Sequence, residues 1–329
     1  MLQHSAEREP VDGQVARSIQ LGQVLSNQPL CREHYRLTFR LPELGTAYPG
    51  QFVHLCPGLP GADSYRTWNG GDAPECDEWL SRLGRPLIRR GFSIAGLARE
   101  PDGVRVEVIY RVVGTATRWM ESLGAGESIS VLGPLGNRFP IVSHKPVAWL
   151  AAGGVGLPPM LWLAASLHEA GKEVVAFCGA RTVDLLPLTL DPSVPIAADA
   201  GRASLAAAEF ARHQVPVVIS TDDGSIGFRG YVGSALSTYS ASNPTAGDEV
   251  VVYACGPEPM MRSVSDYCAA RGIECYVCVE RAMACGLGTC QSCVVEVHEP
   301  DRADGWRYRL CCTDGPVFDA RQIIWDIHP

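Results

Sequence analysis

The stretch RAMACGLGTCQSC, residues 281–293, places three thiols within nine residues, at Cys285, Cys290 and Cys293. The side chains between these cysteines are mostly small. A backbone of small residues can fold tightly around a compact group and turn its amide hydrogens toward sulfur atoms. The stretch therefore predicts a loop that wraps a metal-containing group.

A fourth thiol further along the chain extends the pattern C-x4-C-x2-C. Eighteen residues separate Cys293 from Cys312, and Cys311 lies directly before Cys312. Four thiolates in this arrangement match the plant-type spacing of a [2Fe-2S] cluster. Structural zinc sites usually have two short-spaced ligand pairs, whereas the second half here is one isolated cysteine or an adjacent pair. The spacing favours an iron-sulfur cluster over zinc and over ordinary buried thiols.

The other cysteines carry a weaker signal. Cys275 and Cys278 form a C-x2-C in the run IECYVCV, but residues three apart on a strand point to opposite faces, so we expect ordinary packing there. Because the total of thirteen is odd, at least one cysteine stays outside any intrachain disulfide. Five cysteines stand alone and are expected to be inert: Cys31, Cys56, Cys76, Cys178 and Cys268.

The composition is that of a folded protein with more than one domain. The 329 residues are 46% hydrophobic, enough for a core in each of two or three domains. A formal charge of −8 without clustered Lys and Arg argues against nucleic acid or an anionic membrane as a partner. No apolar run reaches about 18 residues, and the opening MLQHSAEREPVDG is charged where a signal peptide is apolar. We expect a cytoplasmic protein with a flexible N-terminus over residues 1–17.

The rest of the chain shows two different sequence patterns, one over residues 18–142 and one over residues 143–273. Residues 18–142 predict an antiparallel β-barrel, because Gly and Pro separate the short strand-like segments YRLTFRL, GQFVHLC, GFSIAG, VRVEVIYRVV and ESISVLG. Between two of these segments, residues 58–84 are rich in turn formers, which predicts an inserted surface loop.

Residues 143–273 predict an α/β domain. The apolar runs PVAWLAA, EVVAFCGA, VPVVIS and EVVVYACG alternate with stretches of helical character, including one face formed by Leu157, Met160, Leu161, Ala164 and Leu167. Strands that are apolar on both faces and separated by helices indicate a parallel sheet covered on both sides. A small segment, 274–329, holds the cysteine group.

Three short stretches could bind nucleotides, each with a plainer alternative. AAGGVGLPPM is a glycine turn before a helix, suited to a pyrophosphate or to a tight turn alone. It lacks the usual G-x-G-x-x-G spacing. RRGFSIAG sets a cation, a ring and a hydroxyl together, as a flavin needs, but is also an ordinary strand. YRVVGTATRWM offers a phosphate cradle or a simple strand-to-helix turn.

In this order the motifs resemble the ferredoxin reductase superfamily, and most closely its family of electron-transfer subunits of NAD-dependent dihydroorotate dehydrogenases. The resemblance covers roughly residues 18–325. Besides the stretches above it rests on GPLGNRF at 133–139, STDDGSIGFRGYVG at 220–233, YACGPEPMM at 253–261, ERAMACGLGTCQSC at 280–293 and CTDGPVF at 312–318.

The resemblance implies three cofactor sites. The barrel of residues 18–142 would bind FAD through Arg90, Gly91, Phe92, Ser93, Ile109, Tyr110, Arg111, Gly114, Thr115, Ala116 and Thr117. The domain of residues 143–273 would bind NAD through Gly153, Gly154, Gly156, Cys255, Gly256 and Pro257. The segment 274–329 would bind the [2Fe-2S] cluster. In the family the cysteine before the DGPVF-like stretch is the fourth ligand, so the implied ligands are Cys285, Cys290, Cys293 and Cys312.

Some of these residues depart from the family or have a plainer interpretation. Gly91 stands where the family usually has Pro, and Ala116 stands where it has a second glycine. The loop 58–84 is longer than the family pattern. Cys255, implied to lie near the nicotinamide, is alternatively a small buried residue at the end of a strand.

The implied activity is electron transfer. No Ser-His-Asp set or carboxylate pair with catalytic context is present, so no catalytic residue is predicted. In the family a partner dihydroorotate dehydrogenase subunit, an FMN flavoprotein, passes electrons through the cluster and FAD to NAD in pyrimidine biosynthesis, within a heterotetramer. The chain alone is not expected to oxidise dihydroorotate. The alternatives are the small subunit of a bifurcating ferredoxin NADP oxidoreductase, a free-standing NADH reductase, and a carrier that holds the cluster without nucleotides.

Overall fold

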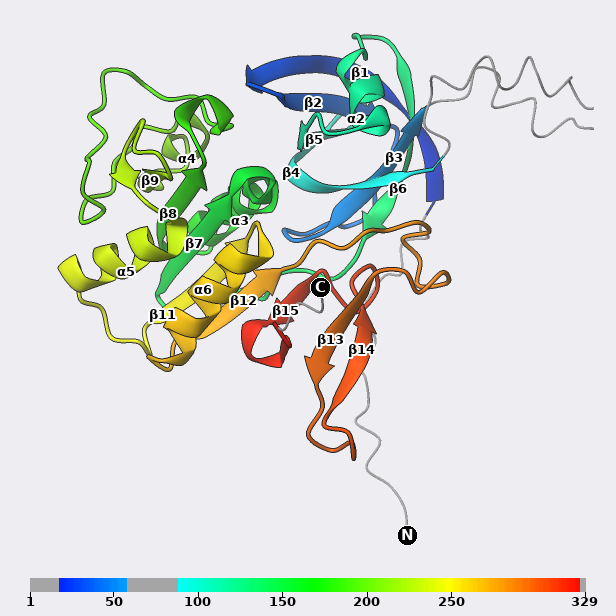
Figure 1. Ribbon diagram of the computed structural model, residues 1–329. Coiled ribbons are helices and arrows are strands. Elements are labelled where there is room, and N and C mark those ends of the chain that lie inside the picture. The colour runs from blue at the N-terminus through cyan, green and yellow to red at the C-terminus, as the bar shows by residue number, and fades with distance from the viewer. Residues whose placement is uncertain (1–17, 58–87, 326–329) are drawn as a thin grey trace, which may run out of the picture.

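The computed structural model describes residues 18–57 and 88–325, and its first unit is a closed antiparallel barrel (Figure 1). The barrel strands are β1 (Ser18–Cys31), β2 (His34–Leu41), β3 (Phe52–Pro57), β4 (Arg90–Glu100), β5 (Gly103–Arg111) and β6 (Ser128–Leu135), with the helix α2 (Thr115–Glu121) before β6. They pair in the order β1-β2-β5-β4-β3-β6. The predicted barrel is confirmed. The predicted surface loop of residues 58–84 lies outside the described residues.

Along the regularly paired strands of the barrel, alternate residues face its interior. Leu37, Phe39, Ile94, Val106 and Val108 are fully buried there. The strand β1 was not among the segments that the sequence pattern identified. Its pairing with β2 shifts register twice, between Val24 and Ser26 and between Pro29 and Cys31, so its inward and outward positions do not follow a regular alternation.

The second unit is a seven-stranded sheet in the order β10-β9-β8-β7-β11-β12-β15. Six strands are parallel: β7 (Val147–Gly153), β8 (Glu173–Ala180), β9 (Val217–Thr221), β10 (Phe228–Arg229), β11 (Val250–Cys255) and β12 (Glu274–Cys278). The short strand β15 (Val317–Asp319) adds antiparallel to β12. The predicted α/β domain with a parallel sheet is confirmed.

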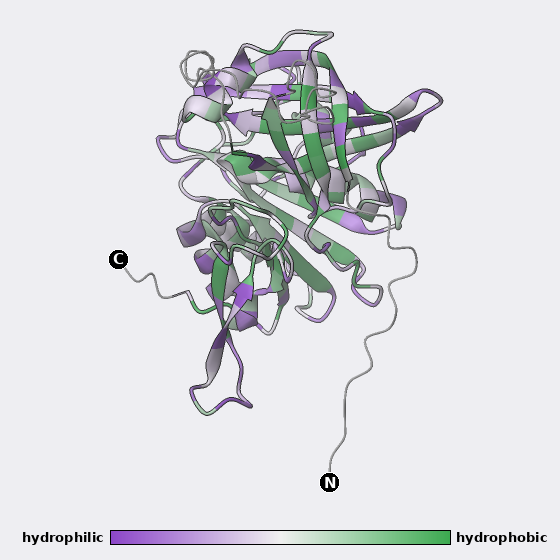
Figure 2. Cartoon of the chain, turned by 90° about the vertical axis from the view of Figure 1, so that its right-hand side faces the viewer, coloured by the Kyte–Doolittle hydropathy of each residue, from purple (hydrophilic) through white to green (hydrophobic). Residues whose placement is uncertain are grey.

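Both faces of this sheet are covered, which explains its uninterrupted apolar strands. Trp149 and Ala151 of β7 pack with the helices α5 (Val232–Ser242) and α6 (Glu258–Ala269), while Ala148 and Leu150 pack with α3 (Leu157–Glu169) and α4 (Ala208–Ala211) on the other face. Figure 2 shows hydrophobic colour along the strands and hydrophilic colour in many of the connecting loops. None of the helices in the described residues is long and apolar enough to cross a membrane.

The C-terminal segment leaves the sheet and returns to it. After β12 the cysteine-rich loop leads into the hairpin of β13 (Val294–His298) and β14 (Trp306–Leu310), and the chain then re-enters the sheet as β15. The described residues also contain the 3-10 helices η2 (Gly154–Gly156), η3 (Val183–Leu185) and η4 (Ala320–Gln322). Since β12 and β15 pair with the sheet, the predicted boundary between residues 273 and 274 falls at the start of a sheet strand and stays a prediction.

Candidate functional site

The cysteine-rich loop is arranged around the sulfur of Cys285. The backbone N–H groups of Leu287 and Cys290 donate to this sulfur, at N–S distances of 3.3 and 3.4 Å. Gly286 and Gly288 have φ angles of +70° and +85°, a conformation that side chains disfavour, so glycine at these two positions lets the loop turn its amides inward. This inward-facing set of donors fits a group that carries negatively charged sulfur.

The other two thiols of the loop lie in different surroundings. Cys290 is exposed, and its hydrogen bond with the Ser292 hydroxyl lowers its pKa to about 6, which favours the thiolate that binds metal. Cys293 is 2% exposed at the base of the loop. The backbone carbonyl of Cys293 accepts a hydrogen bond from the N–H of Cys311, which brings the end of β14 against the loop.

The adjacent thiols Cys311 and Cys312 point to different partners. The Cys311 sulfur donates to the carbonyl of Val279 at 3.2 Å and is fully buried. The Cys312 thiol instead hydrogen-bonds the Cys293 thiol. It also lies close enough to Cys285 for the charge of the Cys285 sulfur to raise the pKa of Cys312. Burial, followed by that hydrogen bond, raises the pKa of Cys312 to about 12, so its proton would leave when metal binds. Among these two cysteines, Cys312 is the one that faces the loop.

The donor set fits a [2Fe-2S] cluster, although the four thiols do not already form a compact metal site. Within residues 18–57 and 88–325, no three His, Cys, Asp or Glu side chains are placed so that they could hold a metal ion. The fit therefore rests on the thiol spacing, on the inward amides and on the contact between Cys293 and Cys312.

The predicted flavin residues line one end of the barrel. Arg90 and Gly91 are exposed at the start of β4. Within residues 18–57 and 88–325, the Arg90 guanidinium donates only to the carbonyls of Ile88 and Arg89, which leaves donors for a ligand. Arg89 is engaged differently, since it donates to the carbonyl and hydroxyl of Ser130 at 3.1 and 2.7 Å. Of the two neighbouring arginines, Arg90 is therefore the one whose position suits a phosphate.

The motifs on β4 and β5 lie side by side because these strands pair with Ile94 opposite Val108. The Phe92 ring meets the Tyr110 ring edge-on, with centroids 6.2 Å apart, and Tyr110 is buried. Ser93 is half-buried beside them, and Ile109 is buried. The structure thus brings the ring, the hydroxyl and the tyrosine together, whereas the Arg111 guanidinium pairs with Glu33 at 2.7 Å.

The stretch Gly114 to Thr117 begins the helix α2. The Thr117 hydroxyl accepts hydrogen bonds from the N–H groups of Val113 and Gly114, at 2.9 and 3.1 Å, so this side chain caps the helix. Thr115 is exposed and Ala116 is half-buried. A Cβ atom at Gly114 would have no heavy atom within 4 Å, so the space in front of this turn is open to a ligand.

A cavity of about 790 Å³ lies between the barrel and the sheet. Its lining includes Arg111 from the barrel, Gly153 and Gly154 after β7, and Gly256 and Pro257 after β11. These turns lie at the carboxyl ends of parallel strands, where open α/β sheets bind ligands. The volume is in the range typical of sites for small molecules and cofactors.

Tight packing forms the floor of this cavity. A Cβ atom at Gly156 would come within 2.1 Å of the carbonyl oxygen of Cys255, and one at Gly153 within 2.7 Å of the Met260 sulfur. The glycine turn is therefore seated on the end of β11. The structure brings the two predicted halves of the NAD site together, although Gly156 and Cys255 lie beneath the lining.

Sequence reasoning missed part of the cavity wall and the pairing of two cysteines. Arg181 lines the cavity but lies in none of the quoted motifs, and Tyr231 lines it within the stretch 220–233, which was assigned to no site. Cys255 stands opposite Cys278 in adjacent strands, and the hydrogen bond between their thiols, with burial, raises the pKa of Cys278. Strand order, which the local pattern does not contain, creates this contact.

The predicted opposite orientation of Cys275 and Cys278 is confirmed, because they pack on different faces of the sheet. The expectation that Cys268 is inert stays a prediction, but in the folded chain this cysteine has a neighbouring thiol. Its thiol hydrogen-bonds that of Cys275. The helix α6 carries Cys268 against the sheet face on which Cys275 lies, a contact between segments that are not neighbours along one element.

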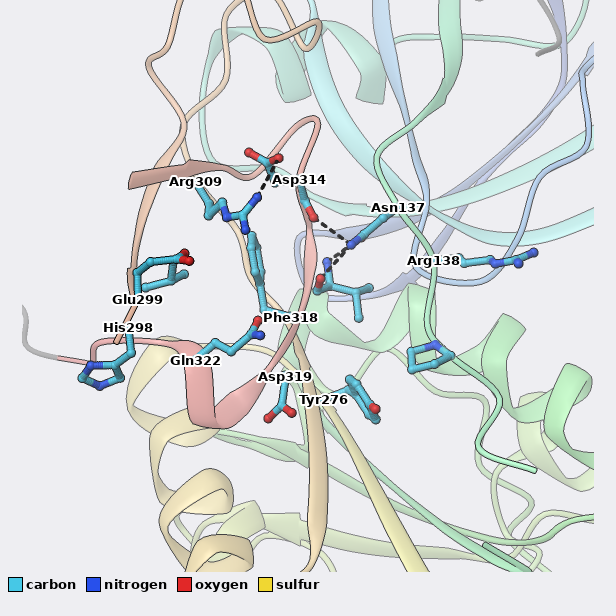
Figure 3. A pocket seen from close by; sticks show the side chains of 13 residues that line it. Asn137, Arg138, Tyr276, His298, Glu299, Arg309, Asp314, Phe318, Asp319 and Gln322 are labelled. Atoms are coloured by element: carbon cyan, nitrogen blue, oxygen red, sulfur yellow. Dashed lines mark hydrogen bonds and ion pairs between the residues drawn. The ribbon is translucent and has the colours of Figure 1, made fainter. Parts of the chain in front are cut away.

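A second cavity, of about 510 Å³, lies where the barrel meets the C-terminal segment (Figure 3). The Asn137 side chain crosses between the two. Its amide N–H₂ group donates to the carbonyls of Asp314 and Val317, both at 2.8 Å, and its oxygen accepts from the N–H of Val317 at 2.9 Å. Arg309 pairs with Asp314 at 3.6 Å on the far wall. Asn137 thus ties the barrel to the segment that carries Cys312.

Comparison with protein families and with known proteins agrees with this geometry. Residues 280–324 match the family model of the iron-sulfur cluster binding domain of dihydroorotate dehydrogenase B. The chain is 30% identical to the "Dihydroorotate dehydrogenase B (NAD(+)), electron transfer subunit" of Desulforamulus reducens over 293 residues, which cover 89% of this chain and 93% of that one. The protein of the same name from a Geobacillus species is 30% identical over 92% of this chain and 96% of its own.

Solved structures share the fold at lower identity. The NADH-dependent reduced ferredoxin-NADP oxidoreductase, studied for flavin-based electron bifurcation, aligns with a TM-score of 0.68 at 22% identity and covers 92% of this chain and 90% of its own. The ferredoxin reductase of carbazole 1,9a-dioxygenase aligns with a TM-score of 0.55 at 20% identity, over 79% and 68% of the two chains. These likenesses show a common architecture of barrel and parallel-sheet domain.

Proposed function

This chain belongs to the family of electron transfer subunits of dihydroorotate dehydrogenase B, and from that membership we propose that it carries electrons between a partner dehydrogenase subunit and NAD in pyrimidine biosynthesis. The partner is the catalytic dihydroorotate dehydrogenase subunit, an FMN flavoprotein, and the assembly is a heterotetramer. The chain is an oxidoreductase subunit that does not oxidise dihydroorotate by itself. We place it in the cytoplasm, where thiols stay reduced.

Bound FAD can exchange two electrons with NAD as a hydride and single electrons with an iron-sulfur cluster, so it would link two-electron transfer to one-electron transfer. The protein's own residues position these groups. Arg90 offers guanidinium donors to the flavin phosphates, Phe92 and Tyr110 provide apolar ring surface, and Ser93 provides a hydroxyl beside it. The open turn at Gly114 and Thr115 accepts phosphate oxygens.

The NAD site is the 790 Å³ cavity. The glycine turn lets the dinucleotide approach the backbone at Gly154, because a Cβ atom built there would have no heavy atom within 4 Å. Arg111 of β5 lines this cavity, so the cavity borders the barrel strand that also carries Tyr110. This shared wall is the observation that supports the proposal, since a nicotinamide bound in the cavity would lie beside a flavin bound at the barrel, as direct hydride transfer requires.

The cluster loop offers a route toward the partner. Leu287 is 44% exposed, and Thr289 and Cys290 are exposed beside it. A cluster held at Cys285, Cys290, Cys293 and Cys312 would therefore lie near the protein surface on one side and near the barrel on the other. A second flavoprotein could approach this exposed loop closely enough to exchange electrons.

The decisive experiment compares the chain alone with the chain and its catalytic subunit. The purified chain, loaded with FAD and cluster, should pass electrons from NADH to an artificial one-electron acceptor and show no dihydroorotate-dependent NAD reduction. Adding the catalytic subunit should confer that activity. Dihydroorotate oxidation by this chain alone, or NADPH oxidation coupled to ferredoxin in place of the expected reaction, would contradict the proposal.

A further inference from the structure

His54 is a buried histidine that no motif explains. It lies in the middle of β3, in register with Gly91 on β4 and with Leu132 on β6, and its side chain is 0% exposed. Neither ring nitrogen, Nδ1 or Nε2, has a hydrogen-bond partner in the part of the chain that the structure describes. A buried polar group without a partner costs about 1–3 kcal/mol, so its retention calls for a reason.

The imidazole lies between two of the proposed cofactor sites. On one side, a Cβ atom built at Gly91, within the flavin stretch, would be 3.4 Å from Cδ2 and Nε2 of His54. On the other side, a Cβ atom built at Gly286 would be 2.6 Å from Cε1, 2.9 Å from Nε2 and 3.0 Å from Nδ1. Gly286 directly follows Cys285. The ring edge that carries both nitrogens therefore faces the cluster loop.

The charge state of His54 follows from its surroundings. Burial is the main cause that lowers its pKa to about 4, and the positive charges of Arg89 and Arg90 lower it further. The ring is neutral at physiological pH, with one N–H donor and one acceptor. The neighbouring Phe52 ring, with its centroid 5.6 Å away, offers only an apolar surface. Among the described residues, the cluster loop is the segment that both ring nitrogens face, so a group carried by this loop is in position to accept the ring N–H.

We propose that His54 is a positioning residue that donates its ring N–H to a sulfur of the cluster bound by the loop of residues 285–293. The inference rests on the proposed function, since it needs the cluster in place. The hydrogen bond would satisfy the orphaned donor and fix the loop on the barrel wall behind the flavin stretch. Because a hydrogen bond to sulfur stabilises the more negative, reduced cluster, it would also raise the reduction potential.

The test compares two substitutions of His54 in the full chain loaded with cofactors. His54→Leu removes the donor, whereas His54→Gln keeps an N–H group near the position of Nε2. We expect His54→Leu to retain FAD and iron and to shift the cluster's redox equilibrium about tenfold toward the oxidised form, which is about 59 mV for a one-electron couple. His54→Gln should restore most of the shift. The measurement is a potentiometric titration followed by electron paramagnetic resonance.

His34 provides a matched control. It is also buried in the barrel, at 2% exposed, and its Nε2 lacks a partner among the described residues, but it lines the NAD cavity and not the cluster loop. His34→Leu should leave the cluster potential unchanged.

A second measurement detects the hydrogen bond directly. In wild-type protein labelled with ¹⁵N-histidine, the reduced cluster should show a hyperfine coupling to ¹⁵N, and His54→Leu should remove this coupling.

Each other outcome counts against the proposal. An unchanged cluster potential in His54→Leu would mean that the ring only fills space, and a shift confined to the flavin would assign the donor to FAD. If His54→Leu fails to hold iron, His54→Gln decides. Loss of the cluster in His54→Gln as well, or a cluster potential in this variant that differs from the wild type by the full shift expected for His54→Leu, would overturn the hydrogen bond. Iron and sulfide analysis of the wild type tests the proposed function separately.

Discussion

Cys311 and Cys312 are neighbours in the chain, yet their side chains serve different parts of the structure. Cys311 donates to the Val279 carbonyl inside the core that covers one face of the sheet, and Cys312 meets Cys293 under the loop. Both residues lie in the turn that follows β14, where the backbone N–H groups of Thr313, Asp314 and Gly315 donate to the carbonyl of Leu310, and in this turn the two side chains contact different partners. One of the two thiols is therefore available for a cluster while the other packs.

We expect Cys312→Ser to lose most of its iron, with metal affinity lowered at least tenfold, roughly, because a ligand thiolate is replaced by a hydroxyl. The matched control is Cys311→Ser, which should keep the visible spectrum of the cluster and lower the free energy of unfolding by about 1–3 kcal/mol, since a hydroxyl is then buried. Iron analysis and denaturant unfolding measure the two effects. The reverse pattern would assign the fourth ligand to Cys311.

Arg90 is the arginine of the flavin stretch whose donors are not engaged by any side chain in the part of the chain that the structure describes. Arg90→Ala should weaken FAD binding by about tenfold to a hundredfold, the loss expected for a charge-assisted hydrogen bond. Arg99 lies on the same strand and donates to the carbonyls of Leu44 and Gly45, far along the barrel, so Arg99→Ala is the control and should bind FAD normally. Fluorescence titration of the apoprotein with FAD measures both. Equal affinity in the two variants would remove Arg90 from the site.

The turn formed by η2 and the start of α3 depends on its contact with the end of β11. Gly156 has no room for a side chain, since its Cβ atom would lie 2.1 Å from the Cys255 carbonyl oxygen and 2.5 Å from the Gly256 nitrogen. The residues that follow, Leu157, Pro158 and Pro159, begin the helix, and a proline is well tolerated at a helix start. The element therefore combines a favourable local sequence with a contact that only glycine permits.

Gly156→Ala should push this turn away from β11 and deform the NAD cavity from beneath. We expect NAD(H) affinity to fall at least about tenfold, since the strain of one such clash is about 1–3 kcal/mol, while FAD content stays normal. Gly124→Ala is the control, because the nearest heavy atom to a Cβ there is the Glu127 carboxylate oxygen at 3.7 Å. Binding of NADH measured by calorimetry distinguishes the two. Unchanged affinity in Gly156→Ala would show that the turn adapts.

The three proposed cofactor sites lie next to one another because the C-terminal segment returns to the sheet beside the barrel. The strand β15 pairs with β12, the Asn137 side chain ties the barrel to the backbone before and within β15, and His54 lies against the loop at Gly286 (Figure 3 shows the Asn137 contacts). The segment is thus fixed at both ends, and the loop between is held against the barrel wall.

Asn137→Ala removes three hydrogen bonds between the barrel and this segment. The variant should lose about 1–3 kcal/mol of stability locally, and hydrogen exchange of residues 310–319 should become faster. Asn243, whose amide donates to the carbonyls of Gly201 and Tyr239 within the α/β domain, is the control, and Asn243→Ala should leave exchange in that segment unchanged. Mass spectrometry of exchanged peptides measures both. Equal exchange in the two variants would mean that β15 alone holds the segment.

The amino-acid pattern was sufficient for everything that depends on neighbours along the chain. The short barrel segments separated by Gly and Pro, the apolar runs of the parallel sheet and the spacing of the cysteines are all local features of the sequence, and both units of the fold are confirmed. The ordered motifs also led to the family to which the chain belongs. The strand β1 escaped this reasoning because its register shifts break the alternation.

Contacts between distant segments required the folded molecule. The pairing of Cys255 with Cys278 follows from the order of strands. The contact of Cys268 with Cys275 arises because the helix α6 packs on the sheet. The place of His54 between Gly91 and Gly286 depends on how the last segment folds back onto the barrel. Side-chain periodicity says which residues are buried together on one face, but not which faces meet, because that choice is made by packing among elements far apart in the chain.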